Sequence, residues 1–273
     1  MSSIGLVASI FRYPVKSMAG EKLESTIINK RGLLGDRAYA LIDTATNKIV
    51  SAKNPKKWPN IFKYYAKYIS EPTENFISGV QIEFPDKQTF LSTQNNIDEK
   101  LTNAFSRSVK LSSTVPQIVQ LEEYFADIQE IKQHDSIVNA NMAEGTFFDL
   151  GTIHLLTTAT LKKFEELYGE GDFHINRFRP NIVVDLNSNH SGFIENEWVG
   201  KNIAIGDEVI LKIKESCPRC VMTTLEQDDL PKDINILKTI IKHNNGNLGI
   251  YADVVRGGII KNNDLIQILE DVK

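Results

Sequence analysis

Ile205-Gly-Asp-Glu-Val-Ile-Leu211 places a Gly-Asp turn directly before an alternating apolar run, and Ile260-Lys-Asn-Asn-Asp-Leu-Ile-Gln-Ile268 repeats this arrangement near the end of the chain. Turns joined in this way to short strands are typical of antiparallel sheets and barrels. From Gly5 to about Val50, and again over 62–91 and 181–213, short apolar runs alternate with turn signals. The sequence therefore predicts a mixed α+β protein that is rich in β-strands.

Helices are expected at only two places. Residues 98–105 predict a short helix, and residues 158–168 predict a longer one, because apolar side chains recur at helical spacing in both segments. Thr158 or Thr160 can cap the second helix, and Gly169 can end it. The predicted protein thus has many strands and few helices.

The chain is long enough for two domains. Residues 112–146 show no long apolar pattern and include Pro116 and Gly145, which is typical of a junction between domains. We therefore predict a first domain over 1–120 and a second over 121–273.

Composition places the chain of 273 residues among ordinary soluble proteins, with 41% hydrophobic and 24% charged residues. A net charge of −4 argues against general nucleic-acid binding, which usually requires a basic surface. No apolar stretch approaches the roughly 18 residues of a membrane span, and the N-terminus lacks a signal pattern. We expect a cytoplasmic protein that binds neither nucleic acid nor membrane.

Cys217-Pro-Arg-Cys220 holds both cysteines of the chain and follows a predicted strand over 208–214. A structural zinc site usually needs four ligands, and the five histidines are scattered singly. A thioredoxin-like pair normally precedes a helix, whereas Val221-Met-Thr-Thr-Leu225 resembles a strand or loop. Two remaining interpretations are a pair of buried small apolar residues and a single thiolate on a soft metal or metal cofactor. Arg219 favours the thiolate, because a nearby guanidinium lowers a thiol pKa.

Four other segments offer donors to an anion through basic side chains, hydroxyls or turn amides. They are Tyr13-Pro-Val-Lys-Ser-Met18, Lys30-Arg-Gly-Leu-Leu-Gly-Asp-Arg37, Leu155-Leu-Thr-Thr-Ala-Thr160 and His174-Ile-Asn-Arg-Phe-Arg-Pro-Asn181. In an extended chain, Arg177 and Arg179 would face one side. Each segment also has a plain structural interpretation: a surface lysine, a surface ion pair, a helix cap, or arginines paired with carboxylates.

Tyr13-Pro-Val-Lys-Ser17 and Arg31-Gly-Leu-Leu-Gly-Asp-Arg37 resemble the two signatures of the N-terminal β-barrel domain in two-domain members of the MOSC family. That family is named for the C-terminal domain of molybdenum-cofactor sulfurase. Five later segments resemble the MOSC domain in the expected order: His154-Leu-Leu-Thr-Thr-Ala-Thr-Leu161, Arg177-Phe-Arg-Pro-Asn-Ile182, Glu197-Trp-Val-Gly200, Ile205-Gly-Asp207 and Cys217-Pro-Arg-Cys-Val-Met-Thr-Thr224. The resemblance covers nearly the whole chain and implies an N-terminal MOSC β-barrel domain followed by a MOSC β-barrel domain.

Within the family, the chain is most similar to members that use a molybdenum cofactor (Mo-molybdopterin) to reduce amidoximes, hydroxylamines and hydroxylated bases. The resemblance implies a molybdenum-dependent oxidoreductase in which Cys220 is the catalytic residue and the metal ligand. It also implies a set of cofactor-binding residues, the last of which comes from the cysteine motif: Lys16, Ser17, Arg37, Thr157, Thr158, Arg177, Arg179, Asn181 and Arg219. The sequence departs from the family after Thr224, where Leu-Glu-Gln-Asp-Asp-Leu-Pro replaces the usual valine-aspartate-proline.

Electrons would come from a separate partner, because two cysteines cannot hold an iron–sulfur cluster that needs four ligands, mostly cysteine. A flavoprotein reductase, or a ferredoxin-like or cytochrome protein, would serve, and the substrate would be a small molecule. Two other functions stay open. The protein could carry sulfur or the cofactor, with a persulfide on Cys220, or it could be a non-catalytic binding module.

Overall fold

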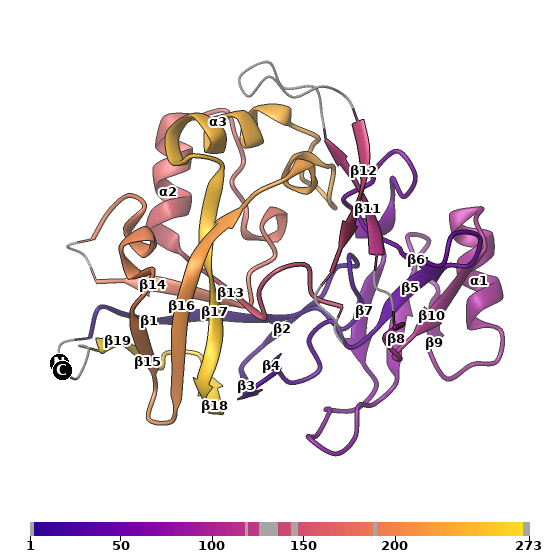
Figure 1. The fold of residues 1–273 in the computed structure, drawn as a ribbon, viewed down its shortest axis with the longest axis horizontal. Helices are drawn as coiled ribbons and strands as arrows, with labels where there is room; N and C mark the ends of the chain where they lie inside the picture. The colour runs from indigo at the N-terminus through magenta and orange to yellow at the C-terminus, as the bar shows by residue number, and fades with distance from the viewer. Residues whose placement is uncertain (1–2, 118–119, 126–135, 143–146, 188–189, 270–273) are drawn as a thin grey trace. The chain divides into compact units, whose positions relative to one another are not determined.

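The computed structural model describes residues 3–117, 120–125, 136–142, 147–187 and 190–269, and it divides into two compact units (Figure 1). We call them the barrel unit (Met1–Phe11, Lys22–Leu34 and Gly151–Lys273) and the middle unit (Arg12–Glu21 and Gly35–Leu150). Each unit is assembled from stretches that are distant in the sequence.

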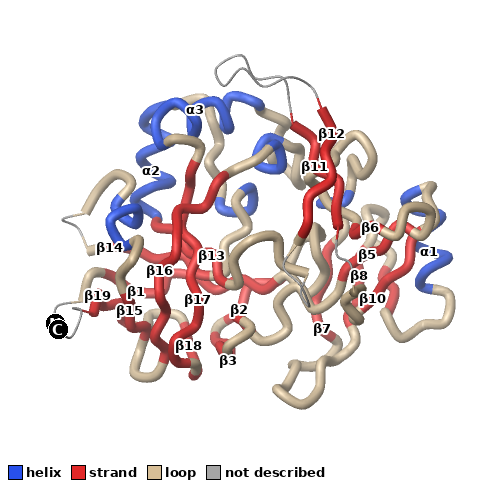
Figure 2. Tube along the Cα trace, viewed as in Figure 1, coloured by secondary structure: helices blue, strands red, loops and turns tan. Residues whose placement is uncertain are grey.

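An eight-stranded sheet dominates the barrel unit, with the strand order β14-β13-β17-β16-β15-β19-β1-β2 (Figure 2). A further pairing between β14 and β1 closes seven of these strands into a barrel. The strands are β1 Gly5–Arg12, β2 Glu21–Leu23, β13 Ile153–Thr157, β14 Ile182–Leu186, β15 Asn202–Ile205, β16 Val209–Pro218, β17 Asn247–Arg256 and β19 Leu265–Leu269. A small sheet of β18 Gly258–Lys261, β3 Ser25–Asn29 and β4 Gly32–Leu33 accompanies it.

Apolar side chains, which alternate with more exposed residues along the strands, fill the interior of the barrel. Val209, Leu211 and Ile213 of β16 are fully buried and belong to the main core cluster, while the residues between them are more exposed. This is the period of two that a strand requires when one of its faces lies on a core. Antiparallel pairing predominates, but β13 and β14 are parallel and are therefore joined by a crossover that contains a helix.

Two α-helices, α2 Thr158–Leu167 and α3 Ile234–Asn244, cover part of the barrel unit. They bury Phe164 and Ile240, among other residues, in a second core cluster. Thr157, not Thr158 or Thr160, caps α2, because its side chain accepts a hydrogen bond from the Thr160 amide. Three short 3-10 helices complete the unit: η3 Ile175–Arg177, η4 Ile194–Trp198 and η5 Val221–Thr224.

In the middle unit, a five-stranded sheet of order β10-β5-β6-β11-β12 and a three-stranded sheet β7-β8-β9 are present. The elements are β5 Ala40–Asp43, β6 Lys48–Ile49, η1 Ile61–Lys63, β7 Tyr65–Tyr68, β8 Val80–Glu83, β9 Thr89–Leu91, α1 Ile97–Phe105, β10 Val109–Ser112, β11 Gln120–Phe125 and β12 Ser136–Asn141. Helix α1 ends at Ser106, which adopts the left-handed conformation that closes a helix.

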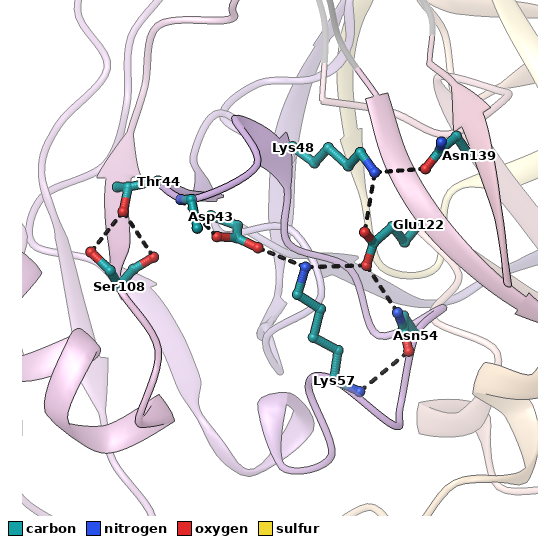
Figure 3. A network of polar contacts seen from close by, with 9 residues as sticks. Asp43, Thr44, Lys48, Asn54, Lys57, Ser108, Glu122 and Asn139 are labelled. Carbon is teal, nitrogen blue, oxygen red and sulfur yellow. Dashed lines mark hydrogen bonds and ion pairs between the residues drawn. The ribbon is translucent and has the colours of Figure 1, made fainter.

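A polar network connects β11 to the rest of the middle unit (Figure 3). Glu122 of β11 accepts hydrogen bonds from Lys48, Lys57 and Asn54, and Lys57 also pairs with Asp43 at 2.7 Å. The backbone pairing of β11 with β6 consists of one residue pair. The charged side chains therefore add to the attachment that the buried Leu121 and the Tyr124 amide already give β11, and networked ion pairs contribute more than isolated surface ones.

The predicted β-rich fold with few helices is confirmed. The short helix predicted over 98–105 is α1, and the longer one predicted over 158–168 is α2. Helix α3 and strands β11 and β12 were not predicted, because the sequence of α3 is rich in isoleucine, which also favours strands, and β12 is polar.

Candidate functional site

The cysteine pair lies where β16 ends and η5 begins. Cys217 is fully buried near the end of β16, and Cys220 is half-buried at the position that precedes η5. Register shifts in the pairing of β16 with β17 at Ser216/Pro218 bend this strand end, as bulges do. The two cysteines therefore have different environments, and only Cys220 retains exposed surface.

Two threonines stabilise the turn that carries Cys220. The amide and the hydroxyl of Thr223 both donate to the Cys220 carbonyl oxygen, at 3.2 and 3.0 Å. The Thr224 hydroxyl donates to the Val221 carbonyl oxygen at 2.8 Å. Such local bonds from threonine hydroxyls compete with regular structure and favour a compact turn, which here fixes the backbone at Cys220.

Arg219 bridges the turn to two other parts of the barrel unit. Its guanidinium donates to Cys217 Sγ at 2.7 Å and to the Phe178 carbonyl oxygen at 2.9 Å, and its amide donates to the Gly246 carbonyl oxygen. Within the part of the chain that the structure describes, Arg219 Nε is a buried donor without an acceptor. A buried N–H without a partner is costly, so this atom marks a place where a ligand would gain a hydrogen bond.

Arg177 is 1% exposed and binds backbone carbonyls. Its nitrogen atoms donate to the carbonyl oxygens of Asp172, Thr223, Leu225 and Pro231, at distances from 2.8 to 3.4 Å. The expectation of an extended chain here is wrong, because Arg177 ends the 3-10 helix η3 and Arg179 has a φ of 53°. Arg177 thus holds the segment that follows Cys220, and its contact with a cofactor stays a prediction.

Asn181 bridges strands of the barrel. Its side-chain oxygen accepts a hydrogen bond from the His154 amide of β13, and its side-chain nitrogen donates to the Phe11 carbonyl oxygen of β1. Asn181 and Arg179 are both buried, with 2% and 7% of their surfaces exposed. For both residues the predicted cofactor contact stays a prediction.

Thr157 and Thr158 use their hydroxyls within the protein. Thr157 donates to Glu195 Oε2 at 2.8 Å, Thr160 donates to the same oxygen at 2.6 Å, and Thr158 donates to Asp185 at 2.7 Å. Glu195 is 1% exposed, and its other oxygen, Oε1, has no partner among the described residues. Burial raises the pKa of Glu195, and the hydrogen bonds from Thr160 and Thr157 offset only part of this effect.

Glu195→Gln is expected to change how stability depends on pH. A carboxyl group whose pKa is higher in the folded state takes up a proton on folding, so the free energy of unfolding falls as pH rises from the unfolded pKa, about 4.3, through the folded pKa. The glutamine cannot ionise, so this fall should be absent in the variant. Urea unfolding of both proteins between about pH 4 and pH 8 measures the difference.

Glu197→Gln is the matched control, because Glu197 lies two residues further along η4 and is exposed. Its stability should follow the wild-type pH profile. Parallel profiles for wild type and Glu195→Gln would contradict the assignment of Glu195 as a buried group that resists ionisation.

In the middle unit, Lys16 is buried and bound to an acid that the sequence did not reveal. Its ammonium group lies 2.5 Å from Asp149 Oδ1 and 3.0 Å from the Phe147 carbonyl oxygen. Lys53 lies 3.8 Å from the other oxygen of Asp149. Burial opposes the ionisation of Asp149, but the charges of Lys16 and Lys53 outweigh it and lower its pKa to about 2. The interpretation of Lys16 as a solvated surface lysine is therefore wrong.

Ser17 and Arg37, also in the middle unit, are held by local contacts. The Ser17 side-chain oxygen accepts a hydrogen bond from the Ala52 amide at 3.0 Å. Arg37 forms an ion pair with Asp36 and lies over the ring of Tyr13, 4.3 Å from its centroid. Both residues stay predicted cofactor ligands.

Three of the predicted cofactor-binding residues have unusual backbones. Ser17, Arg37 and Arg179 adopt φ values of 66°, 48° and 53°. Left-handed backbone is uncommon for residues other than glycine, asparagine and aspartate, and such strain gathers at functional sites. Because Ser106 at the end of α1 adopts the same conformation for a structural reason, the backbone alone does not identify a site, and the cofactor contacts of these three residues stay predictions.

The geometry separates the interpretations of the cysteine pair. Among the described residues, no group of three or more metal-ligating side chains exists, so no four-ligand zinc site is found there. The motif precedes a four-residue 3-10 helix, not the α-helix of a thioredoxin-like pair. Cys217 is fully buried and in contact with Arg219, whereas Cys220 keeps exposed surface. Of the two cysteines, Cys220 is therefore the one that an external ligand can reach, and its role as a metal ligand stays a prediction.

The residues at Cys220 fit an anionic cofactor that carries a soft metal. Cys220 offers one soft ligand, and Arg219 offers positive charge and an N–H without an acceptor in the described chain. Sequence reasoning missed the contacts around this site, namely His154 and Tyr251 near Cys217, and Glu195 beside Thr157. His154 begins one of the segments that resemble the MOSC domain, but nothing in that segment indicates its contact with Cys217. No local pattern distinguishes Tyr251 or Glu195 from ordinary core or surface positions.

The fold and the cysteine motif together define a β-barrel protein that presents a half-buried cysteine at the end of a barrel strand. Sequence comparison agrees: the profile of the MOSC N-terminal beta barrel domain matches residues 4–114, and that of the MOSC domain matches residues 145–267. The chain belongs to the MOSC family, among the members that combine these two domains.

Several relatives show which proteins the chain resembles. Mitochondrial amidoxime reducing component 2 from Rattus norvegicus is 24% identical over 252 residues, which cover 84% of this chain and 69% of the relative. Molybdenum cofactor sulfurase from Bombyx mori is 30% identical over 118 residues, 40% of this chain and 14% of the sulfurase. Among solved structures, the YuaD protein from Bacillus subtilis has a TM-score of 0.48 and 10% identity, over 97% of this chain and 94% of that chain.

Membrane insertion through a helix finds no support in the described residues, since none of their helices is both long and apolar enough to span a bilayer. The cytoplasmic location stays a prediction.

Proposed function

We propose that this protein binds the molybdenum cofactor through Cys220 and reduces N-hydroxylated compounds such as amidoximes and hydroxylamines. The observation that carries the proposal is the half-buried Cys220 thiol beside Arg219, whose Nε–H is buried without an acceptor in the described chain. The similarity to proteins named amidoxime reducing component, over 84% of the chain, supports this choice of reaction.

Reduction of an N–OH group consumes two electrons and two protons and releases water. When bound, the cofactor supplies the electrons and a Lewis-acidic centre. Cys220 provides the thiolate ligand, and the bonds from Thr223 to its carbonyl oxygen keep the backbone in place. The positive charge of Arg219 favours an anionic group next to Cys220.

An external electron donor is part of the proposal. The 273 residues contain two cysteines, which are too few for the four ligands of an iron–sulfur cluster. A flavoprotein reductase, or a ferredoxin-like or cytochrome protein, is the class of partner that would supply the electrons.

A carrier of sulfur or of the cofactor is the second candidate function. The observation that favours it is the similarity of 40% of the chain to a molybdenum cofactor sulfurase. In that case Cys220 would hold a persulfide, or the protein would bind the cofactor and release it unchanged to another protein.

Elemental analysis of protein from a host that makes the cofactor tests the proposal. We expect molybdenum in a stoichiometric amount, an extractable pterin, and reduction of benzamidoxime with an artificial electron donor. Protein from a host unable to make the cofactor serves as the control and should lack all three. Absence of molybdenum from the first sample would overturn the proposal, and a Cys220 persulfide without reductase activity would establish the carrier instead.

A further inference from the structure

Cys217 has no part in the function proposed above, yet it is a buried thiol in contact with a charged side chain. It is fully buried near the end of β16, where its Sγ accepts a hydrogen bond from Arg219 at 2.7 Å. The Pro218 carbonyl oxygen lies 4.0 Å from Cys217 Sγ, which is too far for a strong hydrogen bond. At 2.7 Å, by contrast, the guanidinium of Arg219 is in direct contact with Cys217 Sγ.

A guanidinium cannot lose its proton at accessible pH, so Arg219 brings a permanent positive charge to this buried position. Among the described residues no carboxylate forms an ion pair with Arg219, and its Nη2 binds the neutral Phe178 carbonyl oxygen. A charge that is partly removed from water is stabilised by an opposite charge. Cys217 is the strongest candidate for that charge, ahead of Tyr251 and Cys220, which also interact with Arg219.

The other groups that face Cys217 also favour the thiolate. They are His154 of β13 and Tyr251 of β17, whose side chains hydrogen-bond to it. Burial alone raises the pKa of the Cys217 thiol, but the charges of Arg219 and His154 and these hydrogen bonds outweigh burial and lower the pKa to about 6.

We propose that Cys217 is a positioning residue, which as a buried thiolate holds the Arg219 guanidinium in an ion pair and so fixes Arg219 next to Cys220. Two nitrogen atoms of Arg219 are thereby anchored, to Cys217 and to Phe178, and Nε keeps an N–H that is not committed within the described chain. The ion pair is a property of the protein alone. Its role in holding the cofactor rests on the proposed function.

Titration of Cys217 in the Cys220→Ala variant tests the ion pair. Only one thiol then remains, so the ultraviolet absorbance of the thiolate reports Cys217 directly, without cofactor. We expect a midpoint near the value of about 6. A second change, Arg219→Met, should raise this midpoint by about one to three pH units, whereas Arg219→Lys should raise it less. A midpoint of about 8.5 or higher in Cys220→Ala, or no shift in either double variant, would overturn the ion pair.

Molybdenum content tests the role in cofactor binding, with Cys220 present. Cys217→Ser removes the negative charge and is expected to lower the bound molybdenum about 10- to 100-fold. Cys217→Asp keeps an anion facing Arg219 and should retain several times more molybdenum than Cys217→Ser. Equal molybdenum in both variants and the wild type would overturn the positioning role. If the wild type itself lacks molybdenum, the proposed function fails, while the titration still decides whether the ion pair exists.

Discussion

Cys220→Ser is expected to remove molybdenum and to lower the rate of benzamidoxime reduction more than any other single change in this chain. A serine hydroxyl stays protonated at neutral pH and is a hard donor, so it cannot replace a thiolate on a soft metal. Loss of an outer partner of a metal ligand typically costs about 10- to 100-fold. Loss of the ligand itself should cost on the order of 100-fold or more.

The measurement is the molybdenum content and the reduction rate per protein, with the melting temperature recorded alongside. Because Cys220 is half-buried and the turn is held by Thr223 and Thr224, the variant should fold normally. Glu215→Gln, an exposed change on β16, the strand that leads to Cys220, should keep wild-type molybdenum and activity. Full activity in Cys220→Ser would remove this residue from the chemistry.

Local patterns in the sequence predicted the strands of the barrel well, because Val209, Leu211 and Ile213 follow the period of two that one buried face imposes. The local patterns failed where the secondary structure that a segment favours by itself differs from the one that its tertiary contacts stabilise. Helix α3 contains four isoleucines, which taken alone favour a strand. Its amphipathic face is stabilised by burial in the core cluster that it shares with α2, a contact that no local pattern reveals.

In the candidate site, too, some features could be predicted from local sequence and others depend on tertiary contacts. Motif segments identified Cys220 and Arg219, which are adjacent in the chain. The partners of Cys217 come from strands β13 and β17, so the contact depends on barrel closure and has no local signature. The left-handed backbones of Ser17, Arg37 and Arg179 could not be predicted either, since these residue types disfavour that conformation. Such conflicts between local preference and structure are expected at functional sites.

Arg177→Met is expected to cause the largest loss of stability among the residues of the site. The guanidinium donates to four carbonyl oxygens, three of which belong to the segment from Thr223 to Pro231 that follows Cys220. The bonds to Thr223 and Leu225 are buried, whereas the other two carbonyls belong to exposed residues, where water can reach them. Each of the two buried carbonyls left without a donor costs about 1–3 kcal/mol. Removal of the buried charge recovers part of this cost, since burial already lowers the pKa of Arg177. We expect a net loss of about 3 kcal/mol, with a melting temperature lower by roughly 6–12 °C.

Hydrogen exchange distinguishes this explanation from a general loss of packing. If Arg177 holds the segment after Cys220, the amides of residues 223–231 should exchange faster in Arg177→Met, while those of the barrel strands change less. Arg177→Lys keeps the charge but lacks the planar set of donors, so it should recover only part of the stability. Arg31→Met replaces an exposed arginine and should stay within about 0.5 kcal/mol of the wild type. A melting temperature of Arg177→Met equal to that of this control would show that the carbonyl contacts contribute little, and that the turn at Cys220 is held by Thr223 and Thr224 alone.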